Sequence, residues 1–128
     1  MKIDLVYSFF EVINLFELKL EFNKGILFAR CSGALVREEV IKINRDLLNF
    51  LINNEVKYLV YNLYNLNEID SAGINALLNT KYVINKHQGM VIVCEAPNKL
   101  MKCFQKINFN MVNNEIDAIN YMRNGYGI

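Results

Sequence analysis

Two short apolar runs, each followed by a helical pattern, constrain the fold of this chain more than any other feature. Residues 58–64 contain Tyr58-Leu59-Val60-Tyr61, and residues 90–94 read Met-Val-Ile-Val-Cys, with little alternation between apolar and polar side chains. Such runs are typical of strands that are buried on both faces at the centre of a parallel sheet. Parallel neighbours need crossover connections, which are usually helices. The sequence therefore predicts an α/β fold.

The other predicted elements fit around this centre. Residues 16–22 alternate apolar and charged side chains, which predicts a half-buried strand, and a turn at 23–25 leads into an antiparallel second strand at 25–31. We expect Ser32-Gly33 to end that second strand and residues 66–70 to connect the 58–64 strand to the next helix. Apolar spacing predicts helices at 37–53, at 71–86, from Pro97 onward and at 115–122, the last with Ile116, Ile119 and Met122 inward, and a short edge strand at 108–112. The expected sheet is mixed, with four to five strands, a parallel centre and about four helices.

Length and charge restrict the function. A chain of 128 residues with a net charge of +1 forms one domain and has no basic field for a nucleic acid. No apolar run approaches the ~20 residues that span a bilayer, and the first residues make a poor signal peptide, so we expect no membrane insertion. Cys31, Cys94 and Cys103 lack metal-binding spacing and are expected to be buried thiols in the cytoplasm. With His87 as the one histidine, the sequence predicts a protein that is not an enzyme and needs no metal or cofactor.

Asp70-Ser71, at the start of the 71–86 helix, is the candidate site. In open α/β sheets, binding sites lie at the carboxyl ends of the strands, which is where this segment follows the 58–64 strand. By spacing alone the pair is a helix N-cap, in which a side-chain oxygen of Asp70 or Ser71 accepts a backbone N–H of the first turn. Gly73 would let a neighbouring backbone approach the helix closely.

Asp70-Ser71-Ala72-Gly73-Ile74, followed by Leu77-Leu78, resembles the Asp-Ser-Ser-Gly-Leu signature of the STAS domain, the fold of bacterial anti-sigma factor antagonists. The similarity covers about residues 16–124, so we expect a single STAS domain over 1–128, with its core at 15–124 and an N-terminal extension at 1–14 whose structure is left open. Four further segments are similar to the family in the same order: Ser32-Gly33-Ala34-Leu35, Tyr58-Leu59-Val60-Tyr61-Asn62-Leu63, Gln88-Gly89-Met90-Val91-Ile92-Val93, and residues 97–109.

The resemblance implies a switch. In such antagonists the serine directly after the motif aspartate, here Ser71, is phosphorylated by a partner anti-sigma factor with serine kinase activity. The unphosphorylated domain binds the anti-sigma factor, the phosphorylated one is released, and a phosphatase restores it. The implied protein acts as a monomer or homodimer. Its implied partner-binding residues are Leu35, Val36, Asp70, Ala72, Gly73, Ile74 and Asn75.

Three positions depart from the family pattern. Ala72 stands where the family commonly has Ser or Thr, and the acidic residues of its Ser-Gly-Glu-Leu-Asp segment are replaced by Ala34 and Val36. Together with residues 1–14, Ala34 and Val36 keep a second interpretation open: a constitutive STAS scaffold without phospho-switching, in a stressosome-like assembly or as the soluble component of a membrane transporter.

Overall fold

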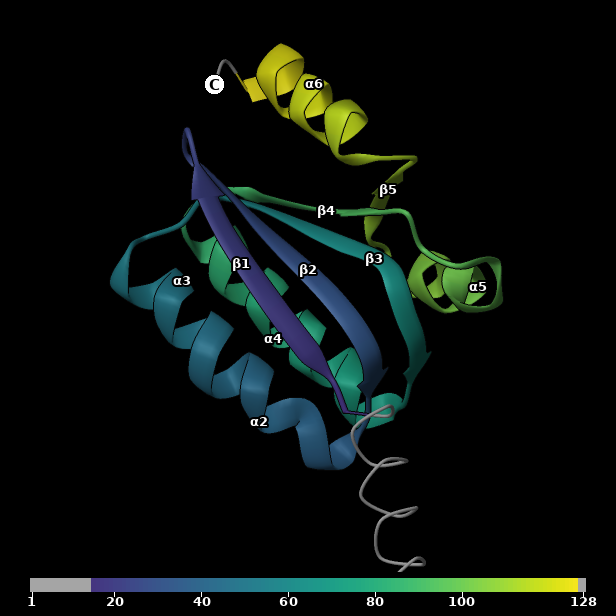
Figure 1. The fold of residues 1–128 in the computed structure, drawn as a ribbon. Helices are drawn as coiled ribbons and strands as arrows, with labels where there is room; N and C mark the ends of the chain where they lie inside the picture. Colours follow the sequence, from purple (N-terminus) through teal and green to yellow (C-terminus); the bar gives the residue numbers. More distant parts are fainter. Residues whose placement is uncertain (1–14, 127–128) are drawn as a thin grey trace, which may run out of the picture.

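The computed structural model describes residues 15–126, which form one mixed five-stranded sheet with its strands in chain order (Figure 1). β1 (Glu17–Asn23) pairs antiparallel with β2 (Ile26–Leu35). β2, β3 (Tyr58–Ile69), β4 (Met90–Cys94) and β5 (Asn110–Val112) are parallel. The predicted α/β class, antiparallel first pair and parallel centre are confirmed.

Helices connect the parallel strands, as the sequence predicts. The segment between β2 and β3 runs through η1 (Arg37–Glu39), α2 (Val40–Lys42), the π-helical η2 (Ile43–Leu48) and α3 (Asn49–Asn53), which together match the predicted helix at 37–53. α4 (Ser71–Lys86) has the predicted bounds. The chain continues through α5 (Asn98–Lys106) before β5 and through α6 (Glu115–Tyr126) after it.

The two faces of the sheet are covered unequally. On β3, Leu59, Tyr61 and Leu63 belong to the larger apolar core, which packs against α2 to α4 and includes Phe104 of α5. Val60 points to the opposite face, into a smaller core with Ala118 and Met122 of α6. Figure 1 shows α6 on the side of the sheet away from α2, α3 and α4. Burial on both faces explains the unalternated apolar runs of β3 and β4.

Both strands that lead to the candidate site are longer than predicted. Ser32-Gly33 does not end β2, which continues to Leu35, and residues 66–69 belong to β3. The two extensions pair with each other, Gly33 with Leu66 and Leu35 with Ile69, across shifts in register. Gly33 makes this possible because it adopts a left-handed conformation (φ 84°) and because a Cβ there would overlap the backbone of Leu15.

Two predictions about side-chain burial are wrong. Ile116, expected to face inward, is 69% exposed, because Ala118 and Met122 supply the buried stripe of α6. Cys103 is half-buried, whereas Cys31 and Cys94 are buried as predicted. The expectation about residues 1–14 lies outside the described residues.

Candidate functional site

The start of α4 has the predicted N-cap, and of the two candidates, Asp70 and Ser71, the cap is Asp70. Asp70 has extended backbone geometry, and its Oδ1 accepts a 2.9 Å hydrogen bond from the N–H of Gly73. Its Oδ2 accepts a second bond, 3.0 Å long, from the N–H of Arg37, which begins the helical segment after β2. One carboxylate therefore caps α4 and ties it to the end of the neighbouring strand.

A close backbone approach holds the same two elements together. The N–H of Asp70 donates a 3.3 Å hydrogen bond to the carbonyl of Leu35, the last residue of β2. A Cβ at Gly73 would overlap that same Leu35 oxygen and crowd the Ile69 side chain. Position 73 therefore has to be glycine for the helix to sit this close to β2.

Hydrogen bonds to Asp70 set its charge. The N–H of Gly73 contributes most to a pKa below the ordinary value, and burial opposes it to a smaller extent. The N–H of Arg37 and then that of Ala72 lower the pKa further. Donors that bond to the ionised form favour it. Asp70 is therefore an anion throughout the neutral range, directly beside Ser71.

The structure brings the predicted site residues together and shows which side chains are accessible. Ser71 and Asn75 are exposed, and within residues 15–126 no hydrogen bond engages the Ser71 hydroxyl. Leu35 and Gly73 are buried and support the surface from below. The half-buried members are Val36, Asp70, Ala72 and Ile74.

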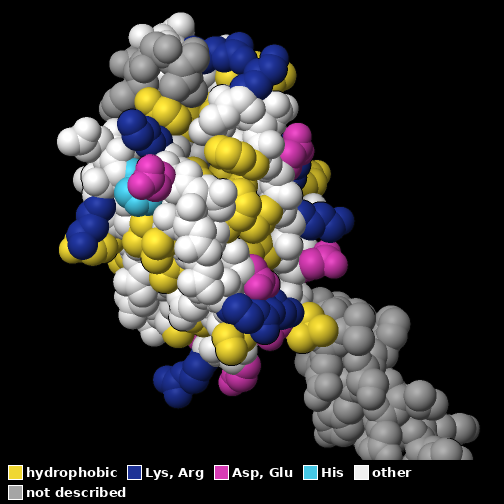
Figure 2. All heavy atoms as spheres, turned by 90° about the vertical axis from the view of Figure 1, so that its left-hand side faces the viewer, with side chains coloured by type: hydrophobic (Ala, Val, Ile, Leu, Met, Phe, Trp, Pro, Cys, Tyr) yellow, Lys and Arg dark blue, Asp and Glu magenta, His cyan; other side chains and the backbone are white. Residues whose placement is uncertain are grey.

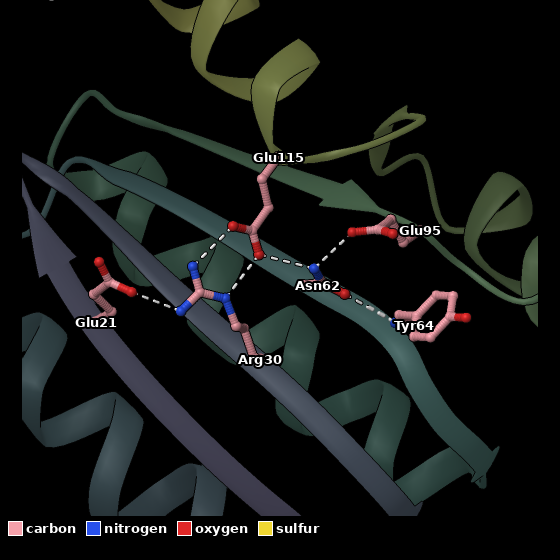
Figure 3. Close-up of polar contacts among 6 residues, drawn as sticks. All are labelled: Glu21, Arg30, Asn62, Tyr64, Glu95 and Glu115. Atoms are coloured by element: carbon pink, nitrogen blue, oxygen red, sulfur yellow. Dashed lines mark hydrogen bonds and ion pairs between the residues drawn. The ribbon is translucent and has the colours of Figure 1, made fainter.

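A polar cluster on the α6 side of the sheet was not found from the sequence (Figure 3). The Arg30 guanidinium of β2 donates from Nε and Nη2 to the two Glu115 oxygens, at 2.8 Å each, and from Nη1 to Glu21 at 2.7 Å. Asn62 of β3 donates from Nδ2 to Glu95 and to Glu115, both at 2.8 Å. The signal in the sequence is Arg30, the one charged residue in a largely apolar strand. No local pattern predicts its partner Glu115, which lies 85 positions further along the chain.

This cluster attaches the first turn of α6 to the sheet. The hydrogen bonds from Arg30, followed by the one from Asn62, lower the pKa of Glu115, and the two carboxylates raise the pKa of Arg30. Bidentate arginine–carboxylate pairs are among the stronger and more directional hydrogen bonds. The start of α6 is therefore held by charge as well as by its apolar contacts.

Neither a metal-binding cluster nor a membrane-spanning helix is found in the part of the chain that the structure describes. Over residues 15–126, no three His, Cys, Asp or Glu side chains cluster in a way that could hold a metal ion. No helix among these residues is long and apolar enough to cross a membrane.

A mixed five-stranded sheet in this order, with helices on both faces, makes residues 15–126 a small α/β domain. The family model of the STAS domain matches residues 17–119, and the chain belongs to the STAS domain family. A curated relative, the "Anti-sigma F factor antagonist" of Paenibacillus polymyxa, is 25% identical over 79 residues, which are 62% of this chain and 68% of the relative.

Solved structures agree in fold. The anti-sigma factor antagonist SpoIIAA matches in its unphosphorylated form with a TM-score of 0.72 and 22% identity, over 84% of this chain and 98% of that one. Its phosphorylated form, from Bacillus, matches with a TM-score of 0.71 and 22% identity, over 84% and 100%. A sulfate transporter family protein from Wolinella succinogenes matches with a TM-score of 0.66 and 14% identity, over 80% and 88%.

Proposed function

We propose that this chain is an anti-sigma factor antagonist, a non-enzymatic switch that binds an anti-sigma factor and is released when that partner phosphorylates Ser71. The observation that carries the proposal is the exposed Ser71 directly after the capping Asp70, where its hydroxyl is open to a kinase. The curated relative of the same description and the solved phosphorylated form of SpoIIAA support it. When the unphosphorylated chain binds the anti-sigma factor in the cytoplasm, the anti-sigma factor would release its sigma factor.

The surface around Ser71 suits a reversible protein contact. Val36, Ala72 and Ile74 provide half-buried apolar groups, and Asn75 provides an exposed amide. Leu35 and Gly73 are buried, so their part in binding is to set the height of this surface. The surface is carried by two elements that Asp70 joins, which keeps it rigid before the partner arrives.

Phosphorylation would change the surface while leaving the fold intact. A phosphate adds about −1.5 to −2 charges at pH 7, and the N-terminus of a helix tolerates an anion because its free N–H groups and dipole favour negative charge. In the complex the same phosphate would lie beside the ionised Asp70 and would have to be desolvated against the partner. The partner would therefore dissociate, and a phosphatase would restore binding.

The test is direct phosphorylation. The protein is incubated with its cognate anti-sigma kinase and ATP, and the phosphate is mapped by mass spectrometry; we expect it on Ser71, and none in Ser71→Ala. Ser32, half-buried at the register shift of β2, serves as the matched control, because Ser32→Ala should be phosphorylated like the wild type. Phosphate at another residue, or none with a partner that binds, would rule out the switch.

A constitutive STAS scaffold is the second candidate function, and two observations favour it. The two positions that are acidic in the family pattern carry alanine and valine here. Ala34 is buried and Val36 is half-buried, so this surface lacks both acidic groups. The fold is also shared with the sulfate transporter family protein. A large homo-oligomer, or a gene beside transporter components, would favour this function, whereas a monomer or dimer encoded beside a kinase and a sigma factor would favour the switch.

A further inference from the structure

β1 forms one edge of the sheet and leaves half of its backbone groups available. It pairs with β2 on one side, and among residues 15–126 no strand lies on its other side. Lys24 and Gly25, both at positive φ, form a two-residue hairpin turn that closes on the pair Asn23 and Ile26. Because hydrogen-bonded and non-hydrogen-bonded pairs alternate along an antiparallel ladder, the N–H and C=O groups of Leu18, Leu20 and Phe22 point away from β2. An edge of this kind is a template for a further strand.

The side chains along this edge are apolar on one face. Leu18 and Leu20 are half-buried against the larger core, and Phe22 is 50% exposed although its ring lies edge-on against Phe50 of α3, with centroids 5.8 Å apart. Figure 2, which views the molecule from the side of α2, α3 and β1, shows hydrophobic side chains gathered in the middle of this face between charged ones. The edge therefore offers both backbone hydrogen bonds and apolar surface.

We infer that β1 pairs antiparallel with β1 of a second copy of this chain, about a two-fold axis at Leu20. In this register Leu20 faces Leu20 and Leu18 faces Phe22 on the apolar face. On the other face, Lys19 of each copy faces Glu21 of its partner, and Glu17 faces Asn23. All seven residues of the strand are paired, and opposite charges meet twice.

Neighbouring registers are less favourable. An axis at Lys19 would oppose Lys19 to itself and Glu17 to Glu21, and an axis at Glu21 would oppose Glu21 to itself. Like charges directly opposite each other destabilise a strand pair. An axis at Leu18 pairs Glu17 with Lys19 but needs Phe16, which is buried and whose N–H is already bonded to Glu39 at 2.8 Å.

The charges within one copy also favour this contact. In the β1–β2 ladder Lys19 lies opposite Arg30, so two cations are neighbours within one chain. Glu21 of the same chain accepts a 2.7 Å hydrogen bond from Nη1 of Arg30. In the dimer, Glu21 of the second copy would lie beside Lys19 and balance this pair. The inference does not rest on the proposed function, and the start of α4 stays outside this edge.

The experiment measures the mass of the full chain by sedimentation equilibrium. We expect the wild type to reach twice the 14.9 kDa of one chain, and Lys19→Glu and Glu21→Lys each to remain at the single-chain mass. Mixing the two variants in equal amounts should restore the dimer, because positions 19 and 21 are then both acidic in one chain and both basic in the other. Lys102→Glu, the same charge reversal on α5, should dimerise like the wild type.

Two results would overturn the inference. A wild type that stays a monomer at every concentration would show that the edge is not self-pairing. A dimer unaffected by Lys19→Glu would show that another surface, such as residues 1–14, holds the copies together. Circular dichroism confirms that the variants fold; if Glu21→Lys does not, because it loses Arg30, the comparison of Lys19→Glu with Lys102→Glu decides the question alone.

Discussion

The starts of α4 and α6 have the same kind of N-cap, but the residue after the cap makes different contacts in the two helices. Each helix is preceded by an Asp or Asn whose side-chain oxygen accepts the N–H three residues ahead: Asp70 from Gly73 at 2.9 Å, and Asn114 from Asp117 at 2.8 Å. The first residue of each helix then differs. Ser71 is exposed, whereas Glu115 bonds to Arg30 on β2 and to Asn62 on β3.

The cap sets the residue at which each of these helices begins. The next residue determines whether the helix start is bonded to the sheet, as at Glu115, or exposed, as at Ser71. At α6 the first residue ties the helix to the sheet from 85 positions away. At α4 the attachment is made by Asp70 and Gly73, and Ser71, the first residue of the helix, stays exposed. Substitutions at the two helix starts test this division of roles.

Gly73→Ala should destabilise the protein by about 3 kcal/mol, the upper range for overpacking a tight contact. An alanine Cβ would overlap the Leu35 carbonyl oxygen, and two backbones would have to separate. In an unconstrained helix the change from glycine to alanine stabilises the helix by up to ~1 kcal/mol. A loss of stability in Gly73→Ala would therefore indicate the close backbone contact rather than helix propensity. Urea unfolding measures the effect. The matched control is Asp117→Ala, the equivalent position of α6, which is exposed and should change little.

Arg30→Met should cost about 2 kcal/mol. It leaves Glu115, which is partly buried, without its two strongest hydrogen bonds, and a bond to a charged group contributes roughly 1.5–3 kcal/mol before screening by solvent. Hydrogen exchange should increase mainly in α6. Arg45→Met removes an arginine whose partner, Asp46, is its exposed neighbour, and should leave the unfolding curve unchanged. Equal effects of the two variants would contradict the role given to Arg30.

Asn114→Ala should destabilise the protein by about 1 kcal/mol, the usual contribution of an N-cap. Asp70→Ala should cost more than Asn114→Ala, because Asp70 also accepts the N–H of Arg37 and so loses a long-range bond as well as a cap. Thermal or urea unfolding of the two variants side by side makes the comparison. The reverse order would mean that the bond to Arg37 contributes nothing to stability.

Acid should weaken both helix starts. Asp70 and Glu115 have folded pKa values below their ordinary ones, so their contribution is present at neutral pH, above the unfolded values of about 4, and is lost as pH falls through the lowered values. The unfolding free energy of Asp70→Asn and of Glu115→Gln should therefore fall less steeply than that of the wild type below about pH 4. Parallel curves would show that neither carboxyl is linked to folding.

Ser71→Asp should have the smallest effect on stability, within about 1 kcal/mol, the scale of a cap change. On the proposed function it should nevertheless weaken binding of the anti-sigma factor, because the new charge would lie beside Asp70 in the proposed contact surface. Calorimetry measures binding, and thermal unfolding measures stability. Global unfolding of this variant would contradict a role in recognition, and unchanged binding would place the partner elsewhere.

Features set by local pattern were predictable, and features that join distant segments were not. The apolar runs of β3 and β4 predicted the parallel centre, and the Asp70-Ser71 pair predicted a helix that starts near Ser71. The extension of β2 and β3 depends on the close contact of Gly33 with the backbone of Leu15, which no run of apolar residues reveals. The bonds from Asp70 to Arg37 and from Arg30 to Glu115 span 33 and 85 positions, so only the folded sheet brings their partners together.

The order of the strands has a consequence for how the chain is synthesised. Because each strand lies beside the one that precedes it in the sequence, every strand after β1 leaves the ribosome with its partner already made. Among the strands of residues 15–126, none has to be inserted between two that have already paired, and the β1–β2 hairpin, the most local contact of the sheet, emerges before β3, β4 and β5. The sheet can therefore grow outward from β1 as translation proceeds, and α6, made after the five described strands, covers the second face with its apolar side chains and bonds to Arg30 of β2.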